Sequence, residues 1–114
     1  MKIDLVNLST EKFFNKKSIG LWIEDELTKH GYDNNWLVEV LIVDKSKMRA
    51  INKKYRQKDK VTDVLSFPQF DTLPKEGKGE VLGSIVLCPK AFGNQEAEEL
   101  LRHSVKHLIG IHHK

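Results

Sequence analysis

Three histidines near the end of the chain have the residue type and the spacing of metal ligands. His103 and His107 are four residues apart, so on a helix they lie one turn apart on the same side. Gly110 can end that helix in the left-handed conformation, and the returning chain can then supply His113 as a third nitrogen. Three neutral imidazoles leave a fourth position for water, which is the layout of a catalytic zinc site. The spacing therefore predicts one Zn²⁺ ion held by these side chains.

The same spacing, His-x-x-x-His-x-x-Gly-x-x-His, is the zinc-binding frame of the metzincin proteases. Those enzymes carry a glutamate directly after the first histidine, where it acts as the general base. Here that position is Ser104, which is a poor base at neutral pH. The pattern therefore predicts a metal hydrolase site and argues against peptide hydrolysis. The alternative is a solvated, histidine-rich tail with casual affinity for metal ions.

A basic segment is the second feature that could do chemistry. Residues 45–60 carry a net charge of +7, whereas the rest of the chain sums to −4. Such a concentration is typical of a face that binds a polyanion. Arg56 could hold two phosphate oxygens with its planar fork, unless it is a surface arginine paired with Asp59 or Asp63. The lysines that could follow a phosphate backbone, or else form a solvated helix face, are Lys53, Lys54, Lys58 and Lys60.

Length and composition limit the class of protein. The 114 residues predict one domain, 1–114, with a single core. The one cysteine, Cys88, excludes an internal disulfide and fits a small buried side chain in a reducing compartment. The N-terminus does not resemble a signal peptide, and no apolar run is long enough to cross a bilayer. We therefore expect a cytoplasmic protein without a membrane partner.

The pattern of apolar residues predicts the element order β-α-β-α-β-β-α, and hence an α+β fold with a small mixed sheet of about four strands packed with helices. A helix joins the second and third strands, so a parallel crossover is possible there. Polar residues offer helix caps at Ser9 or Thr10 and at Asp44 or Ser46. The expected strands are 2–8, 36–43, 61–67 and 81–88. The expected helices run from about 11 or 18 to 30, from 45 to 56 and from 96 to 109. The second helix is expected to face inward with Met48, Ile51 and Tyr55, and the third with Leu100, Leu101, Val105, Leu108 and Ile109.

With these pieces placed, the chain resembles the YbeY family of bacterial endoribonucleases over most of residues 51–113. The resemblance rests on Ile-Asn-Lys-Lys-Tyr-Arg-Gln-Lys-Asp at 51–59, Thr-Asp-Val-Leu-Ser-Phe-Pro at 62–68, Leu-Gly-Ser-Ile-Val at 82–86 and the three histidines. The chain departs from the family pattern at several places, and the segment between the strand 81–88 and the first histidine looks shorter than usual. Ser84 replaces an aspartate, Ser104 replaces a glycine, and Ile111-His112 replace a tyrosine-aspartate pair. The chain also stops soon after His113, where the family continues into a further helix, so this ligand is expected to fray unless a metal or a partner holds it.

The resemblance implies a single-strand-specific, metal-dependent endoribonuclease that acts in 16S ribosomal RNA maturation and ribosome quality control. It implies a zincin-like metal helix near the C-terminus, one zinc ion on His103, His107 and His113, and an Arg56 that contacts phosphate while metal-bound water attacks the phosphodiester. The implied partners are single-stranded ribosomal RNA and the small ribosomal subunit or its assembly proteins. His112 remains an alternative third ligand. The general acid stays open between His112, Ser84 and a second water, and so does the oligomeric state.

A second function is compatible with the same residues. In that alternative the chain is a non-catalytic ribosome-assembly factor, in which the metal only stabilises the C-terminus and the basic helix binds RNA. Cleavage of RNA would support the enzyme, and salt-sensitive binding without cleavage would support the assembly factor. Phe67 is expected to belong to the core rather than to form a platform for a base.

Overall fold

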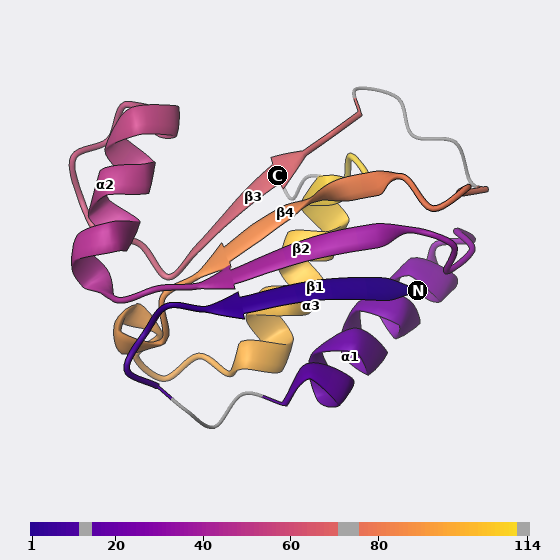
Figure 1. Cartoon of the computed structure of the whole chain (residues 1–114), viewed down its shortest axis with the longest axis horizontal. Helices are drawn as coiled ribbons and strands as arrows, with labels where there is room; N and C mark the ends of the chain where they lie inside the picture. Colours follow the sequence, from indigo (N-terminus) through magenta and orange to yellow (C-terminus); the bar gives the residue numbers. More distant parts are fainter. Residues whose placement is uncertain (12–14, 71–75, 112–114) are drawn as a thin grey trace.

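The computed structural model describes residues 1–11, 15–70 and 76–111 (Figure 1). The predicted order β-α-β-α-β-β-α is confirmed, with one additional turn of 3-10 helix before the last α-helix. The strands are β1 (Lys2–Asn7), β2 (Leu37–Ile42), β3 (Val64–Pro68) and β4 (Val81–Leu87). The helices are α1 (Lys16–Lys29), α2 (Lys45–Arg56), the 3-10 turn η1 (Pro89–Ala91) and α3 (Ala97–Leu108).

The four strands form one mixed sheet in the order β1-β2-β4-β3. β1, β2 and β4 are parallel, and β3 is an edge strand that runs antiparallel to β4. The predicted α+β class with a small mixed sheet is confirmed. The suggested parallel crossover between β2 and β3 is wrong, because β4 lies between them and β3 runs the other way. Val64 at the start of β3 and Ile42 at the end of β2 both lie opposite Leu87. The chain therefore leaves β2 and enters β3 at the same end of the sheet, with α2 between them.

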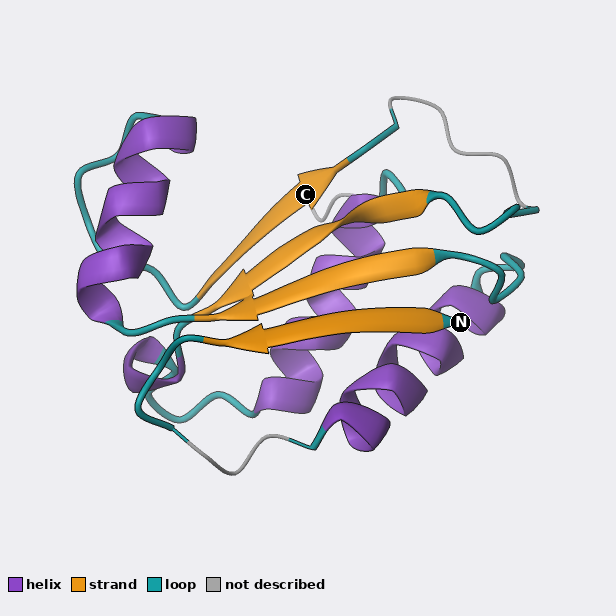
Figure 2. Ribbon diagram, viewed as in Figure 1, coloured by secondary structure: helices purple, strands orange, loops and turns teal. Residues whose placement is uncertain are grey.

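Two helices cover one face of the sheet and create the main core (Figure 2). α1 and α3 lie side by side on this face, and the predicted inward residues of α3 are all buried. Ile19, Ile23 and Leu27 of α1 are at most 1% exposed, as expected for an apolar stripe at helical spacing. The strand residues that pack against them are Ile3, Val38, Val40, Ile42, Leu82, Ile85 and Leu87.

α2 lies over the opposite face, where a smaller cluster is buried. Met48 of α2 and Cys88 are fully buried there, so the expectation for Cys88 is confirmed. Burial raises the pKa of the Cys88 thiol. The prediction that Tyr55 faces inward is wrong, since its side chain is 59% exposed. A groove lies between α2 and the sheet, and Tyr55 lines it rather than lying in the core.

The start of α1 is capped by Asn15, which is not among the caps predicted from the sequence. The side chain of Asn15 accepts hydrogen bonds from the backbone N–H groups of Lys17 (2.8 Å) and Ser18 (3.3 Å). The expected cap at Ser9 or Thr10 is wrong, because the N–H of Thr10 instead donates to the carboxylate of Asp44 (3.2 Å). Asp44 precedes α2 as predicted, but its side chain is used by this contact and makes no cap hydrogen bond to α2.

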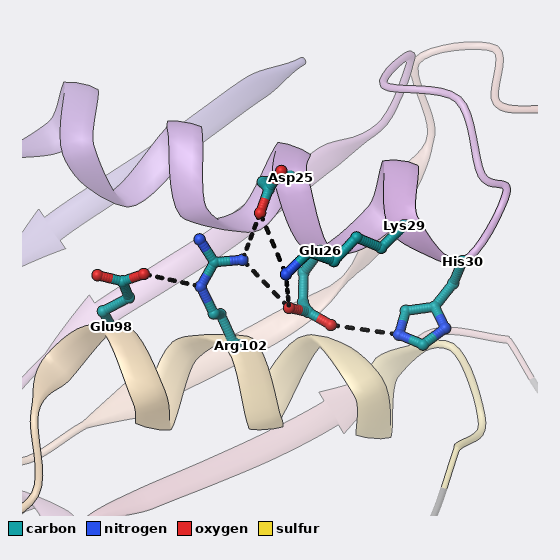
Figure 3. A network of polar contacts seen from close by, with 6 residues as sticks. All are labelled: Asp25, Glu26, Lys29, His30, Glu98 and Arg102. Atoms are coloured by element: carbon teal, nitrogen blue, oxygen red, sulfur yellow. Dashed lines mark hydrogen bonds and ion pairs between the residues drawn. The ribbon is translucent and has the colours of Figure 1, made fainter.

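An ion network joins α3 to α1 (Figure 3). Arg102 of α3 donates to Glu98 on its own helix (2.9 Å) and to Asp25 (2.6 Å) and Glu26 (3.2 Å) of α1. Glu26 is only 4% exposed and also contacts His30 (3.2 Å). Burial raises the pKa of Glu26, but the hydrogen bonds with Arg102 and His30 and the charges of Lys29 and Lys106 together outweigh it, and the net pKa lies below its usual value. The network therefore fixes α3 on α1 through a carboxylate that stays ionised.

Candidate metal and phosphate site

The imidazoles of His103 and His107 converge on the side of α3 that faces away from the ion network. Their Nε2 atoms are 2.9 Å apart and their ring centroids are 4.6 Å apart, and both side chains are half-buried. Two histidine nitrogens on a tetrahedral zinc ion are about 3.3 Å apart, given zinc–nitrogen bonds of about 2.0–2.1 Å. A small rotation of the two rings therefore makes room for an ion between them. The donor set fits zinc, for which imidazole is a common ligand.

The third predicted ligand, His113, and its alternative, His112, lie outside the described residues. Within residues 1–11, 15–70 and 76–111, no cluster of three or more His, Cys, Asp or Glu side chains could hold a metal ion. The turn that leads toward them is described. Gly110 ends α3 with a φ of +84°, and the N–H of Ile111 donates to the carbonyl of Lys106 (2.8 Å). The predicted role of Gly110 as the helix stop is therefore confirmed.

The packing of α3 on the sheet depends on a glycine beneath its last turn. Gly83 lies on the inner face of β4, opposite Val38 of β2. A Cβ atom at this position would come within 2.6 Å of a Leu108 methyl group and 2.7 Å of the Phe67 carbonyl oxygen. The absence of a side chain at Gly83 therefore allows Leu108 to pack closely against β3 and β4. Leu108 follows His107 directly, so this packing helps to position that imidazole relative to the sheet.

The two imidazoles open into a cleft of about 800 Å³ that is bounded by α3, β3 and the segment after α2. Three of the predicted basic residues, Arg56, Lys58 and Lys60, line this cleft together with both histidines. The other lining residues are Asn52, Thr62, Asp63, Val64, Leu65, Ser66, Pro68, Gln95 and Leu100. Residues that are more than 40 positions apart in the sequence thus form one basic cavity beside the paired imidazoles.

Arg56, the last residue of α2, reaches the cleft across β3. Its guanidinium donates to the backbone carbonyl of Ser66, and its Cζ atom lies 5.0 Å from the centroid of the Phe67 ring. The proposed ion pairs with Asp59 and Asp63 are replaced by other contacts: Asp59 pairs with Arg49 (2.7 Å), and Asp63 accepts a hydrogen bond from Gln95 (2.7 Å). A guanidinium has five N–H donors, so the Ser66 contact leaves capacity to bind phosphate.

The four predicted lysines are distributed over different surfaces. Lys58 and Lys60 line the cleft, whereas Lys54 lines the groove on the other side of the sheet and Lys53 lies on the exposed face of α2. A hydrogen bond from Asn52 helps to place Lys58 and Lys60 in the cleft. The Asn52 side chain is 2% exposed and donates to the carbonyl of Lys60 (3.0 Å), which folds the segment after α2 back into the cleft.

Asn52 is not among the residues predicted from the sequence, although its position carried a signal. Asn52 follows the buried Met48 by four residues, so it interrupts the apolar stripe of α2 with an amide that must find a partner. Gln95, another lining residue, precedes α3 and was not singled out either. Its amide contacts Asp63, whose carboxylate is the one acidic group among the described residues that line the cleft.

A pair of hydroxyl groups links β3 to the histidine helix. Ser104, between the two histidines, is fully buried, and its Oγ atom forms a hydrogen bond with the Oγ atom of Ser66. The backbone carbonyl of Ser66 in turn accepts the hydrogen bond from Arg56. Ser66 therefore connects the candidate phosphate-binding arginine to the helix that carries both imidazoles.

None of the helices in the described part of the chain is long and apolar enough to span a membrane.

Comparisons with known proteins agree with the resemblance that the sequence motifs indicate. A family model described as Endoribonuclease YbeY matches residues 5–114. An "Endoribonuclease YbeY" from Aquifex aeolicus is 35% identical over 96% of this chain and 77% of its own length. Proteins with the same name from Sulfurimonas denitrificans (38% identical) and Caldicellulosiruptor saccharolyticus (35% identical) match 90% and 99% of this chain, and 77% and 85% of their own lengths.

Proposed function

Because the chain belongs to the endoribonuclease YbeY family, we propose that it is a metal-dependent endoribonuclease that cleaves single-stranded RNA. The observation that carries this proposal is the meeting of two kinds of group in one cleft. A pair of imidazoles with nitrogens 2.9 Å apart opens into the same cavity as Arg56, Lys58 and Lys60. Paired imidazoles suit a metal ion, and the basic side chains suit the phosphates of an RNA backbone.

The metal site would use His103 and His107 from α3 and His113 from the segment beyond the described residues. A zinc ion bound there would act as a Lewis acid and lower the pKa of a coordinated water molecule toward neutrality. His103 and His107 would bind as neutral imidazoles, so their affinity for zinc should fall at acidic pH. The Ser104 hydroxyl between them contacts Ser66 and orients the helix rather than acting as a base.

The phosphate of the reacting nucleotide would be bound by Arg56. Its guanidinium is held over the Phe67 ring and against the Ser66 carbonyl, so its orientation is fixed before substrate arrives. A preorganised cation of this kind stabilises the charge that develops on the phosphoryl oxygens. Lys58 and Lys60 would neutralise neighbouring phosphates, and their positions are maintained by the buried Asn52.

The biological substrate that we propose is ribosomal RNA of the small subunit, with the small ribosomal subunit or its assembly proteins as partners and a further role in ribosome quality control. Support comes from the family resemblance and from the charge distribution, since residues 45–60 carry +7 on an otherwise acidic chain. A substrate in the small ribosomal subunit would place the protein in the cytoplasm.

The test is cleavage of a single-stranded ribosomal RNA fragment by the zinc-loaded chain, with and without a chelator. We expect Arg56→Ala to reduce the cleavage rate by about 100-fold, the typical loss when one donor to the transition state is removed. His103→Ala should abolish cleavage and weaken zinc binding measured separately by competition with a chromophoric chelator. Arg49→Ala is the matched control, because Arg49 is also on α2 but pairs with Asp59 outside the cleft.

Each outcome discriminates between the candidate functions. Cleavage by the wild type and by Arg49→Ala, with loss in the other two variants, supports the enzyme. Salt-sensitive RNA binding by the folded, zinc-loaded wild type without cleavage would contradict it and favour the non-catalytic assembly factor.

A further inference from the structure

A groove of about 520 Å³ lies between α2 and the outer face of the sheet, on the other side of β3 from the histidine cleft. Successive strand residues point to opposite faces, so Phe67 faces this groove while its neighbours Ser66 and Pro68 line the cleft. Leu41 of β2 and Val86 of β4 are paired in register and continue the apolar floor. The groove is therefore a second concave surface, separated from the metal and phosphate site by a single edge strand.

The wall of the groove carries an exposed aromatic ring. Tyr55 is 59% exposed, and its ring packs edge to face on Phe67 with the centroids 5.6 Å apart and an interplanar angle of 70°. The Nζ atom of Lys54 lies 5.2 Å from the centre of the Tyr55 ring. Phe67 fixes the position of this ring and most of the residue is exposed, so Tyr55 can act as a platform for stacking once the mobile Lys54 side chain turns to a phosphate.

The aromatic pair also connects the groove to the phosphate site. Phe67 contacts Tyr55 through one part of its ring and lies 5.0 Å from the guanidinium carbon of Arg56. Tyr55 and Arg56 are adjacent at the end of α2, so one points toward the groove and the other toward the cleft. A strand whose phosphate is bound by Arg56 therefore has the groove within reach of a neighbouring base.

The chemistry of the groove favours a base over a phosphate or an acidic peptide. Two lysines, Lys47 and Lys54, line it, which is complementary to a polyanionic chain passing along the outside. Its floor is apolar and thus suited to an aromatic base rather than to a charged group. At one end Ser84 donates to the carboxylate of Glu39 (2.9 Å), so a phosphate at that end would be repelled.

Resting on the proposed function, we propose that this groove binds an unpaired nucleobase of the RNA strand, with Tyr55 as the stacking platform and Lys47 and Lys54 beside the backbone. A base within a duplex is already stacked and paired, so it cannot enter the groove without being extruded. The groove therefore gives the protein a physical basis for preferring single-stranded RNA.

The test is the affinity of the chain for a fluorescently labelled single-stranded RNA, measured by anisotropy in the presence of a chelator so that the RNA is not cleaved during the measurement. We expect Tyr55→Ala to weaken binding by about 10-fold, within the range found for one stacked base, and Tyr55→Trp to retain it. Leu21→Ala is the matched control, because Leu21 is similarly exposed (56%) but lies on α1. Lys54→Gln should weaken binding and reduce its salt dependence by about one phosphate contact, whereas Tyr55→Ala should leave the salt dependence unchanged.

An RNA with abasic nucleotides identifies the group that Tyr55 contacts. We expect Tyr55→Ala to lose its effect on an RNA in which the bases next to the bound phosphate are removed. If Tyr55→Ala binds ordinary RNA as tightly as the wild type, the proposal is overturned, and the groove is left as a surface for a protein partner. The same outcome leaves the proposed function intact if the wild type cleaves RNA and Arg56→Ala does not.

Failure of the proposed function has a different signature. A wild-type chain that binds RNA through Tyr55 but never cleaves it supports the base-binding groove and overturns the enzyme. A wild-type chain that neither binds nor cleaves RNA overturns both.

Discussion

Gly83 lies where α3 comes closest to the sheet, and a single methyl group at this position should disturb both stability and the metal site. In Gly83→Ala the new Cβ atom would lie 2.6 Å from Leu108 Cδ2 and 2.7 Å from the Phe67 carbonyl oxygen. Carbon atoms normally pack at about 3.5–4.0 Å, so the Leu108 methyl must retreat by about 1 Å. The carbonyl belongs to β3, which pairs with β4, so it cannot retreat without disturbing the ladder.

The expected cost follows from these two contacts. Overpacking a core typically costs about 1–3 kcal/mol, and distortion of a ladder hydrogen bond adds about 1 kcal/mol. Replacing glycine also reduces the entropy of the unfolded chain, which stabilises the folded chain by about 0.4–1 kcal/mol. We therefore expect the free energy of unfolding of Gly83→Ala to fall by about 1–3.5 kcal/mol, as measured by urea denaturation.

The same substitution elsewhere provides the control. Gly20 is inside α1, and a Cβ atom there would meet only Ile3 Cγ1 at 3.5 Å, an ordinary contact. Because glycine is unfavourable within a helix, Gly20→Ala should stabilise the chain by about 0.5–1 kcal/mol. Equal stability of Gly83→Ala and the wild type would refute the argument, since it would mean that the last turn of α3 does not pack as closely as the structure shows.

A second measurement connects this packing to the metal site. Leu108 follows His107 directly, so its displacement should move one imidazole relative to the other. We expect Gly83→Ala to weaken zinc binding by at least about 10-fold, as is typical when the support of a ligand is disturbed. Gly20→Ala should bind zinc as the wild type does.

Three further predictions concern two contacts that hold α3 in place and one buried thiol beneath α2. Arg102→Leu should lower the free energy of unfolding by about 2–3 kcal/mol at pH 7, because it leaves the buried Glu26 carboxylate without its guanidinium. The folded-state pKa of Glu26 is lowered, so the stabilisation is complete above about pH 4.5 and is lost as the pH falls below that value; the difference between the variant and the wild type in urea denaturation should therefore shrink in acid. A double-mutant cycle of Ser66→Ala and Ser104→Ala should give a coupling of about 1 kcal/mol, and additive effects would contradict the hydroxyl contact. Cys88 should react with a thiol reagent only as fast as the chain unfolds, because it is fully buried and its pKa is raised; fast reaction in the native state would show that this part of the core is open.

Much of the fold and part of the site were predictable from local patterns. The four strands, the three α-helices and the inward face of α3 follow from apolar periodicity, which records which side of an element is buried. The pairing of His103 with His107 follows from helical geometry, since residues four apart lie on one side. Gly110 as the helix stop follows from the backbone conformation that only glycine adopts cheaply.

The errors arose where a residue depends on distant parts of the chain. Tyr55 continues the apolar stripe of α2, yet it is 59% exposed because it contacts Phe67 at the side of an open groove instead of being enclosed between the helix and the sheet. The strand after α2 could have been parallel or antiparallel to its neighbour. Its direction depends on the end of the sheet at which it begins. Asn15, rather than Ser9 or Thr10, caps α1, while the backbone of Thr10 binds Asp44 from 34 residues away.

The sequence alone therefore determined the identity of the chemical groups: paired imidazoles on a helix, an arginine suited to phosphate, and a basic segment in a chain of the endoribonuclease YbeY family. Only the tertiary structure decided which of them share a cavity. It placed Arg56, Lys58 and Lys60 beside the histidines and turned Lys54 and Tyr55 to the other side of β3. The physical reason is that periodicity reports burial within one element, whereas the meeting of side chains from different elements depends on strand order, strand direction and close packing at positions such as Gly83.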